Sequence, residues 1–284
     1  MAKKRKSTAK RKSPARATRG GGSPGTRICN LVESKKTETD WKYEDALAAG
    51  VLGAPAALPS SVDLRAAWWT IGEQENTGSC VGWATAEGVV RYHLVKIGKI
   101  TKAEQLSPRF VWMASKETDQ FMTRPETFLE GAGTSLKAAV DIVKKYGVVK
   151  MSTLPFKITT KMYTGNDNAF YNDAAQRRIT SYFNLGKNLS QWKSWLAGTG
   201  PILVGLTVDQ TFDQATSTGG NLDTFVPNSV RGGHAVSLVG YTASGRFILR
   251  NSWGTTWGDK GFGYASPAYI AAAFFNESYG VDVV

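Results

Sequence analysis

Cysteine and histidine are scarce in this sequence, and their scarcity excludes several kinds of site. The 284 residues include two cysteines, Cys29 and Cys80, and two histidines, His93 and His234. Two of each at these spacings cannot supply the ligands of a zinc centre, so we expect no metal, and we expect no cofactor. Disulfides accumulate in oxidising compartments, so a chain this poor in cysteine is expected to be intracellular and cytoplasmic.

Long apolar runs are also missing. No stretch of eighteen apolar residues is available to cross a bilayer, and no apolar segment of the kind found in signal peptides follows the basic N-terminus. We therefore expect no membrane partner and no secretory leader.

Acidic residues are absent from residues 1–27, which carry ten lysines and arginines. These ten account for most of the formal net charge of +12. The same residues include almost no large apolar side chain, so they cannot bury enough surface to fold and are predicted to form a disordered basic tail. Such a tail binds nucleic acid or another polyanion through phosphate contacts, or it is only a solvated extension, and the sequence leaves both open.

The rest of the chain has the composition of a folded protein. Hydrophobic residues make up 42% of the sequence, and nine tryptophans are available for a core. The pattern is helical over residues 58–165 and turns to short strands over 166–284, which predicts an α+β protein with two lobes. Residues 28–57 form a separate unit between the tail and the first lobe.

The expected elements follow from periodicity and from capping residues. In the first lobe, helices are predicted over residues 80–98, 107–114 and 134–146. In the second lobe, one helix is predicted over residues 190–197, and strands over 202–208, 235–241, 246–251 and 261–265.

The stretch from Gln74 to Ala84 is the strongest candidate for chemistry. Cys80 follows Gly78 and Ser79, where a turn leads into the first predicted helix. In the first turn of a helix, unpaired backbone N–H groups and the helix dipole favour thiolate and lower the pKa of a cysteine. Gln74, six residues earlier, could direct its side-chain amide to the same place and form an oxyanion hole with the Cys80 N–H.

A thiolate nucleophile needs a base, and only two histidines are available. His93 lies thirteen residues along the same predicted helix, roughly 20 Å from Cys80, so it cannot be the partner. His234 begins a strand-like run after two glycines and is the better candidate. Asn251 could accept a hydrogen bond from the far N–H of the His234 imidazole and fix its orientation, and Trp253 could shield that bond from water.

Each of these residues also has a purely structural interpretation. A lone cysteine is usually a small buried hydrophobe, a lone histidine in an apolar strand is usually a satisfied core residue, and an asparagine is usually in a turn. The joint pattern of Gln74, Cys80, His234 and Asn251 in this order favours catalysis, because chance would have to place all four.

Together, Gln74, Gly78-Ser79-Cys80, Gly233-His234-Ala235 and Asn251-Ser252-Trp253-Gly254 resemble the papain-like cysteine peptidases. That resemblance implies a papain-like fold, with a helical left lobe, a β-barrel-like right lobe and the active site in the cleft between them. It also implies substrate-binding roles for the residues that match the family's cleft walls, which are Gly133, Thr134, Ala235 and Trp253.

Two positions depart from the family's pattern around the nucleophile. Thr77 stands where the signature has its first cysteine, and Val81 stands where it has an aromatic residue. Residues 58–65 resemble the start of the mature family members, so residues 28–57 are either an N-terminal extension or a short pro-segment.

The resemblance predicts a cysteine peptidase that hydrolyses peptide bonds through an acyl-enzyme intermediate, with peptides or proteins as substrates. Two alternatives stay open at this point. The same residues could perform another acyl transfer, as an amidase or transpeptidase does, or the chain could be a non-catalytic protein that binds polyanions through its basic tail.

Overall fold

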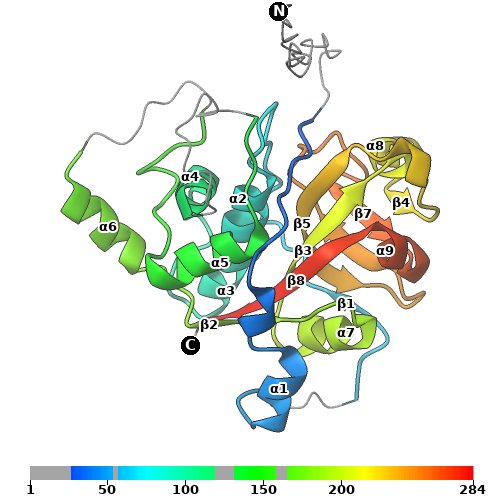
Figure 1. Cartoon of the computed structure of the whole chain (residues 1–284), viewed down its shortest axis with the longest axis horizontal. Coiled ribbons are helices and arrows are strands. Elements are labelled where there is room, and N and C mark those ends of the chain that lie inside the picture. The colour runs from blue at the N-terminus through cyan, green and yellow to red at the C-terminus, as the bar shows by residue number, and fades with distance from the viewer. Residues whose placement is uncertain (1–26, 54–56, 119–130, 158–164, 284) are drawn as a thin grey trace, which may run out of the picture.

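The computed structural model describes residues 27–53, 57–118, 131–157 and 165–283. A helical half and a sheet half lie side by side, and the N-terminal residues from 27 onward run between them (Figure 1). The basic tail, except for Arg27, lies outside the described residues, so its predicted disorder and polyanion binding stay predictions. Among the described helices, none is long and apolar enough to cross a membrane.

The helices begin with short N-terminal turns and continue through both halves. They are η1 (Thr37–Thr39), α1 (Tyr43–Ala48), α2 (Cys80–Thr85), the π-helix η2 (Ala86–Val90), α3 (Arg91–Lys96), α4 (Pro108–Thr118), α5 (Leu136–Lys145), α6 (Asp167–Ala175), α7 (Leu189–Gly198), α8 (Gln210–Asp213), η3 (Ala215–Thr218), η4 (Pro227–Ser229) and α9 (Pro267–Ala273).

The helices of the first lobe start and stop where their capping residues require. The predicted helix over 80–98 corresponds to α2, η2 and α3, which follow one another without a gap. The middle element, η2, is the π-helical turn. Ser107 accepts from the Phe110 N–H at 3.1 Å and starts α4, and Ser135 accepts from the Ala138 N–H at 3.3 Å and starts α5. After α5, Gly147 has a φ of +87°, and an added Cβ there would lie 1.9 Å from the Ala174 oxygen.

The strands are β1 (Val62–Asp63), β2 (Ser181–Asn184), β3 (Ile202–Val208), β4 (Asn221–Leu222), β5 (Gly232–Tyr241), β6 (Phe247–Arg250), β7 (Phe262–Ala265) and β8 (Phe274–Asp282). They form one sheet in the order β2-β8-β3-β5-β6-β7-β4, with β1 paired to β5. Apart from the parallel β4–β7 pair, neighbouring strands are antiparallel. The expected α+β class is confirmed, but the sheet is open and does not close into a barrel.

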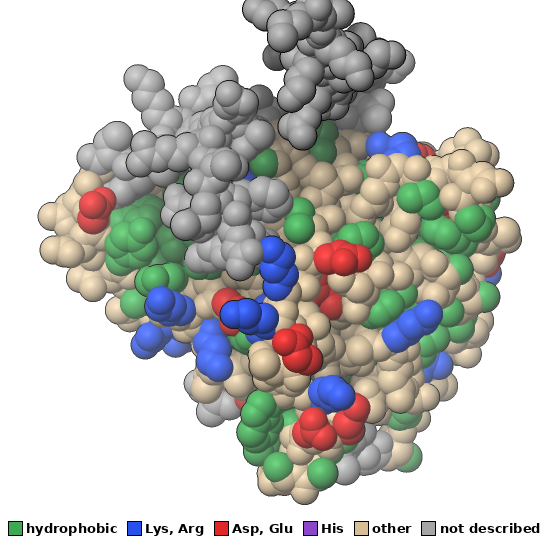
Figure 2. Space-filling model, in the orientation of Figure 1, with side chains coloured by type: hydrophobic (Ala, Val, Ile, Leu, Met, Phe, Trp, Pro, Cys, Tyr) green, Lys and Arg blue, Asp and Glu red, His purple; other side chains and the backbone are tan. Residues whose placement is uncertain are grey.

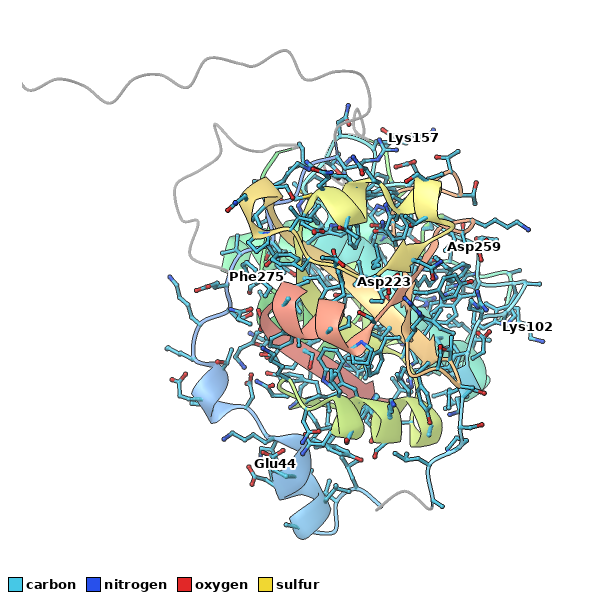
Figure 3. All side chains as sticks on the ribbon, turned by 90° about the vertical axis from the view of Figure 1, so that its right-hand side faces the viewer. Glu44, Lys102, Lys157, Asp223, Asp259 and Phe275 are labelled. Atoms are coloured by element: carbon cyan, nitrogen blue, oxygen red, sulfur yellow. The ribbon has the colours of Figure 1, made fainter. Side chains whose placement is uncertain are left out.

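Several elements had not been expected from the sequence. Helix α6 lies at the start of the portion expected to be β-rich, and its Phe170 packs against Phe110 of α4 with ring centroids 5.7 Å apart. Helix α9 and strand β8 lie near the C-terminus. In Figure 3, α7 and α9 lie in front of the sheet. The ring of Trp195 in α7 packs closely on β8. An added Cβ at Gly280 would lie 2.2 Å from one of its carbons.

Two apolar cores support the two halves, and the N-terminal residues contribute to both. Leu31 belongs to the core formed mainly by α2, α4 and α5, whereas Tyr43 and Ala46 belong to the core between the sheet and α7. Strand β8 also contacts the helical core through Tyr279 and Val281. Leu31, Tyr43 and Ala46 are therefore packed into the interior of the protein.

Candidate active site

Cys80 is the first residue of α2 and is completely buried where that helix meets β5. Backbone N–H groups of Ala235, Val81 and Cys80 itself lie near its sulfur and favour the thiolate. The turn through Gly78 and Ser79 sets this position, because an added Cβ at Gly78 would lie 2.6 Å from the Ala132 oxygen. The thiol thus lies beside the His234-Ala235 step of the opposite wall.

The protonation state of Cys80 differs from what the helix start alone led us to expect. Burial raises the pKa of the Cys80 thiol to about 11, and the three backbone N–H groups lower it only in part. The helix start therefore does supply groups that favour the thiolate. In this structure the removal of water outweighs them, and the neutral thiol is the stable form.

His234 and Asn251 form the second part of the site, on β5 and directly after β6. The His234 Nε2 and the Asn251 Oδ1 are 2.8 Å apart, and both side chains are buried. Among the described residues, the His234 Nδ1 has no hydrogen-bond partner. Burial lowers the pKa of His234 to about 4, so the ring is neutral, with Nε2–H donating to Asn251 and Nδ1 available as a base.

Trp253 covers this pair, as we had expected. Its ring centroid is 4.9 Å from that of His234, and the residue is 5% exposed. The Asn251 Oδ1 also accepts from the Ser252 N–H at 2.8 Å. The imidazole is therefore held between an amide acceptor and an indole, away from bulk water.

Gln74 is oriented by the segment that carries Asn251. Its Oε1 accepts from the Ser252 hydroxyl at 3.0 Å and from the Trp253 indole N–H at 3.1 Å. These bonds fix the amide, so that Nε2 faces the cleft and donates to the Thr77 oxygen at 2.9 Å and the Ile28 oxygen at 3.2 Å. The amide that we expected to donate to the oxyanion thus donates to the Ile28 carbonyl oxygen of the same chain.

Thr77, at the position where the family signature has a cysteine, serves this wall through its hydroxyl. Its Oγ1 donates to the Gln74 oxygen at 2.6 Å and lies 2.6 Å from the Ser79 hydroxyl. Hydrogen bonds therefore secure the turn before Cys80 without a disulfide.

Residues 27–34, which we call the cover segment, run between the helical half and the sheet half (Figure 1). The Leu31 N–H donates to the Gly233 oxygen at 2.9 Å, and the Val32 N–H donates to the Thr134 oxygen at 3.1 Å. Gly133 permits this close approach, because an added Cβ would lie 1.9 Å from the Asn30 oxygen. The predicted substrate-binding residues Gly133 and Thr134 therefore contact an extended strand from the same chain.

The Leu31 side chain fills an apolar pocket beside these contacts. It is 5% exposed, and its Cδ2 would lie 2.7 Å from a Cβ added at Gly205. Phe275 forms another wall, 2.9 Å from a Cβ added at Gly233, and Figure 3 places it at the edge of the sheet next to the N-terminal residues. Glycines at these two positions make the room that Leu31 occupies.

Charged groups hold the two ends of the cover segment. At one end Arg27 forms an ion pair with Glu73 at 2.8 Å, and the Arg231 Nη1 donates to the Arg27 oxygen at 2.9 Å. At the other end the Ser34 hydroxyl donates to the Glu277 Oε1 at 2.6 Å. Acidic and basic side chains are intermixed over the middle of this face in Figure 2.

A cavity of about 480 Å³ adjoins Trp253 at the Arg27 end of the cover segment. Its lining combines two indoles, two hydroxyls and three charged groups: Arg27, Asp213, Thr216, Arg231, Trp253, Thr256 and Trp257. Arg27 is the residue of the cover segment that lines this cavity.

The structure thus brings Gln74, Cys80, His234 and Asn251 together, with Ala235 and Trp253 beside them. His93 lies elsewhere, on α3, where a Cβ added at Gly200 would lie 2.7 Å from its ring. Sequence reasoning missed the contacts of Ile28, Leu31 and Arg231. The apolar run that contains Ile28 and Leu31, directly after a basic stretch, was the one available signal that these residues pack on something.

Comparison with known proteins adds an independent result. Residues 58–270 match the family model described as papain family cysteine protease. The chain is 26% identical over 212 residues to cysteine proteinase 2 of Entamoeba histolytica, covering 72% of this chain and 62% of that protein. It is 26% identical over 207 residues to macrodontain-1 of Ananas macrodontes, covering 72% of this chain and 88% of that protein. The chain thus spans about three fifths of the length of the Entamoeba relative.

Solved structures show the same fold. Xylellain, a cysteine protease from Xylella fastidiosa, is 20% identical with a TM-score of 0.75, covering 93% of this chain and 98% of that one. The bromelain protease from Ananas comosus, in complex with the E64 inhibitor, is 20% identical with a TM-score of 0.61, covering 80% of this chain and all of that one.

Proposed function

The chain belongs to the papain family of cysteine proteases, and on that premise we propose that it hydrolyses peptide bonds with Cys80 as nucleophile, His234 as base and acid, and Asn251 as the residue that orients His234. The observation that carries the proposal is the hydrogen bond from the Gln74 side-chain amide to the Ile28 carbonyl oxygen. A carbonyl oxygen bound there, beside a buried thiol and an imidazole with a free Nδ1, has the surroundings that acyl transfer needs.

The proposed reaction proceeds in two steps. His234 accepts the thiol proton, Cys80 attacks the substrate carbonyl carbon, and the Gln74 amide and Cys80 N–H stabilise the oxyanion. His234 then donates the proton to the leaving amine, which departs and leaves a thioester. Water, deprotonated by His234, attacks the thioester and releases the acid and the free thiol. Asn251 keeps the Nδ1 of His234 directed at the sulfur throughout.

We further propose that the cover segment holds the enzyme latent. It occupies the backbone acceptors at Gly233 and Thr134 and fills the pocket with Leu31, so substrate cannot enter while it is bound. Its departure would readmit water, lower the pKa of Cys80 and raise that of His234, because burial is the first cause of both shifts. Residues 28–57 then act as the short pro-segment that the sequence left open.

The test uses the full-length chain under reducing conditions near neutral pH with a panel of fluorogenic peptides. The Cys80→Ala variant is run in parallel, and the N-terminus of the protein is followed by mass spectrometry. We expect cleavage that the variant lacks, together with trimming between residue 34 and residue 58. No cleavage of any peptide and no reaction of Cys80 with iodoacetamide, even after the cover segment has been removed, would contradict the proposal.

We also propose that the basic residues 1–27 bind a polyanion such as nucleic acid, on the strength of ten positive charges without an acidic residue. Retention of the chain on DNA should fall steeply with salt and vanish when residues 1–26 are deleted. Unchanged retention after the deletion would contradict this role, and neither outcome bears on the peptidase chemistry.

A further inference from the structure

The side of the cleft that receives the leaving group follows from the proposed chemistry. His234 must protonate the departing amine, so the leaving residue lies on the imidazole side of Cys80. The Trp253 ring packs against that of His234, and the cavity of about 480 Å³ adjoins Trp253. Residues that follow the cleaved bond therefore enter this cavity.

The cover segment already places one residue, Arg27, at this cavity, and the protein binds that residue at two points. The Arg27 guanidinium pairs with Glu73 at 2.8 Å, and the Arg27 carbonyl accepts from the Arg231 Nη1 at 2.9 Å. Both contacted groups belong to a single residue. Glu73 and Arg231 therefore lie close enough together to contact the side chain and the main-chain oxygen of one residue.

Both contacting side chains are held in place by neighbours. Asp213 binds Arg231 through two parallel bonds of 2.6 Å, to Nε and to Nη2, and so leaves Nη1 directed at the Arg27 carbonyl. The Glu73 Oε1 accepts from the Glu75 N–H at 3.0 Å, and so leaves Oε2 for the guanidinium. The two charges are thus prepared to bind a residue of complementary chemistry.

We propose that Glu73 and Arg231 form a subsite for a basic leaving residue. Glu73 binds its cationic side chain, and Arg231 binds its carbonyl oxygen. A residue at the C-terminus of a substrate offers Arg231 a carboxylate in place of the carbonyl, so peptides that end in arginine are the preferred substrates. Asp213 is a positioning residue that acts through Arg231. The inference rests on the proposed peptidase function.

The experiment compares four peptides with one acyl sequence, chosen from the fluorogenic panel. The leaving residue is arginine or leucine, each as the free acid and as the amide, and release is measured by chromatography. The enzyme is the full-length chain carrying Leu31→Glu, which weakens the cover segment, and the wild-type chain is run beside it. Glu73→Gln and Arg231→Gln are the test variants. Glu75→Gln and Arg246→Gln, which alter charges outside the subsite, are the matched controls.

We expect kcat/KM for the arginine acid to exceed that for the leucine acid by about five-fold, the value of a partly exposed ion pair. The arginine acid should exceed the arginine amide by about ten-fold, the value of a hydrogen bond between charged groups. Glu73→Gln should abolish the first ratio only, and Arg231→Gln the second ratio only. Both controls should keep both ratios. Equal rates for all four peptides, or ratios that survive in the test variants, would overturn the inference.

A second measurement does not depend on turnover. N-acetyl-arginine should slow the alkylation of Cys80 by iodoacetamide in the Leu31→Glu chain, and N-acetyl-arginine amide and N-acetyl-leucine should slow it less. Equal protection by all three, or none, would overturn the subsite even if peptides are cleaved. An unreactive Cys80 and uncleaved peptides would instead count against the peptidase function itself.

Discussion

The cleft wall and the cover segment that lies on it are held in different ways. In the wall, Gln74, Ser252, Trp253, His234 and Asn251 bond mainly to one another, on elements of a packed core. The cover segment is attached through a few backbone bonds, one buried leucine and charged groups at its ends. The wall is therefore held by its own contacts, and we expect it to keep its geometry when the segment leaves.

The difference teaches where the proposed latency resides. Cys80, His234 and Asn251 already lie in one site, but burial holds the pKa of Cys80 at about 11 and that of His234 at about 4. On the proposed mechanism, activation requires access of water and substrate, with no rearrangement of these groups. Variants in the wall should abolish chemistry, whereas variants in the segment should release it.

The largest effect should come from removing the nucleophile in the wall. Cys80→Ser should lower kcat by more than about 10⁴-fold, because a hydroxyl near neutral pH is a far weaker nucleophile than a thiol. Peptide cleavage by purified variant and wild type measures this loss, and circular dichroism checks that the fold persists. Comparable turnover by the serine variant would refute the assignment of Cys80.

Loss of the oxyanion donor should be the next largest effect. Gln74→Ala should lower kcat by roughly 10²- to 10³-fold, because the amide Nε2 that binds the carbonyl oxygen is lost. Steady-state kinetics on one peptide measures the change, and Glu75→Gln is the matched control in the same loop. An unchanged kcat in Gln74→Ala would mean that another donor holds the oxyanion.

A substitution in the cover segment should raise the reactivity of Cys80, whereas substitutions in the wall lower kcat. Leu31→Glu places a carboxylate in an apolar pocket, which is unfavourable enough to displace the segment. If the pKa of Cys80 then falls from about 11 to about 9, the thiolate fraction at pH 7, and with it the alkylation rate, should rise about 100-fold.

Leu31→Met, which keeps the pocket filled, is the control for that change. Alkylation of Cys80 is followed by peptide mapping, so that Cys29 is counted separately. Equal rates in the two variants and the wild type would show that the segment does not control access to the thiol.

A smaller effect is expected at Asn251, because it orients His234 without reacting. Asn251→Ala removes the 2.8 Å bond to the imidazole and should lower kcat by about ten-fold. The pH–rate profile should also shift, since the ring loses the acceptor for Nε2–H. A variant with wild-type kcat and profile would indicate that Trp253 alone fixes the ring.

The last effect concerns the far end of the cover segment, and it is a change in the pH dependence of stability with no change expected in kcat. Burial raises the pKa of Glu277 from its ordinary value near 4.5 to about 7, with Asp40 adding to the shift. The folded state therefore binds more protons than the unfolded state between these two values, so this group makes the protein less stable as the pH rises from about 4.5 to 7.

Glu277→Gln replaces this carboxyl group with a neutral amide that does not titrate. The variant should be more stable than wild type at pH 7.5, by up to about 3 kcal/mol, and equally stable near pH 4.5. Urea unfolding at the two pH values measures the difference. A variant that is less stable at both would show that the ionised carboxylate, with its bond to Ser34, is favourable in the fold.

The wall could be predicted from the sequence because its residues carry short local signals. A turn before Cys80, glycines before His234 and an Asn-Ser-Trp-Gly run are each confined to a few neighbours, and the helix starts at Ser107 and Ser135 follow local capping rules. Residue 166 was predicted to begin the β-rich part because alternation increases there, but the capping residue Asn166 starts α6 instead.

The cover segment could not be predicted in the same way. Its contacts join Ile28 to Gln74 and Leu31 to Gly233, positions far apart in the sequence, and a short apolar run does not indicate which surface it packs on. The pKa of Cys80 was misjudged for a related reason. The helix start is local and could be read from the sequence, whereas burial depends on residues that come from elsewhere in the chain.

The covalent link between the cover segment and the cleft has a consequence for regulation in time. An inhibitor on the same chain acts at an effective concentration in the millimolar range, which dilution of the protein does not change. The proposed latency is therefore independent of how much of the protein is made. If one molecule trims another, however, the rate at which cover segments are removed grows with the number of molecules already trimmed. The fraction of active protein would then rise abruptly after a delay that depends on the protein concentration.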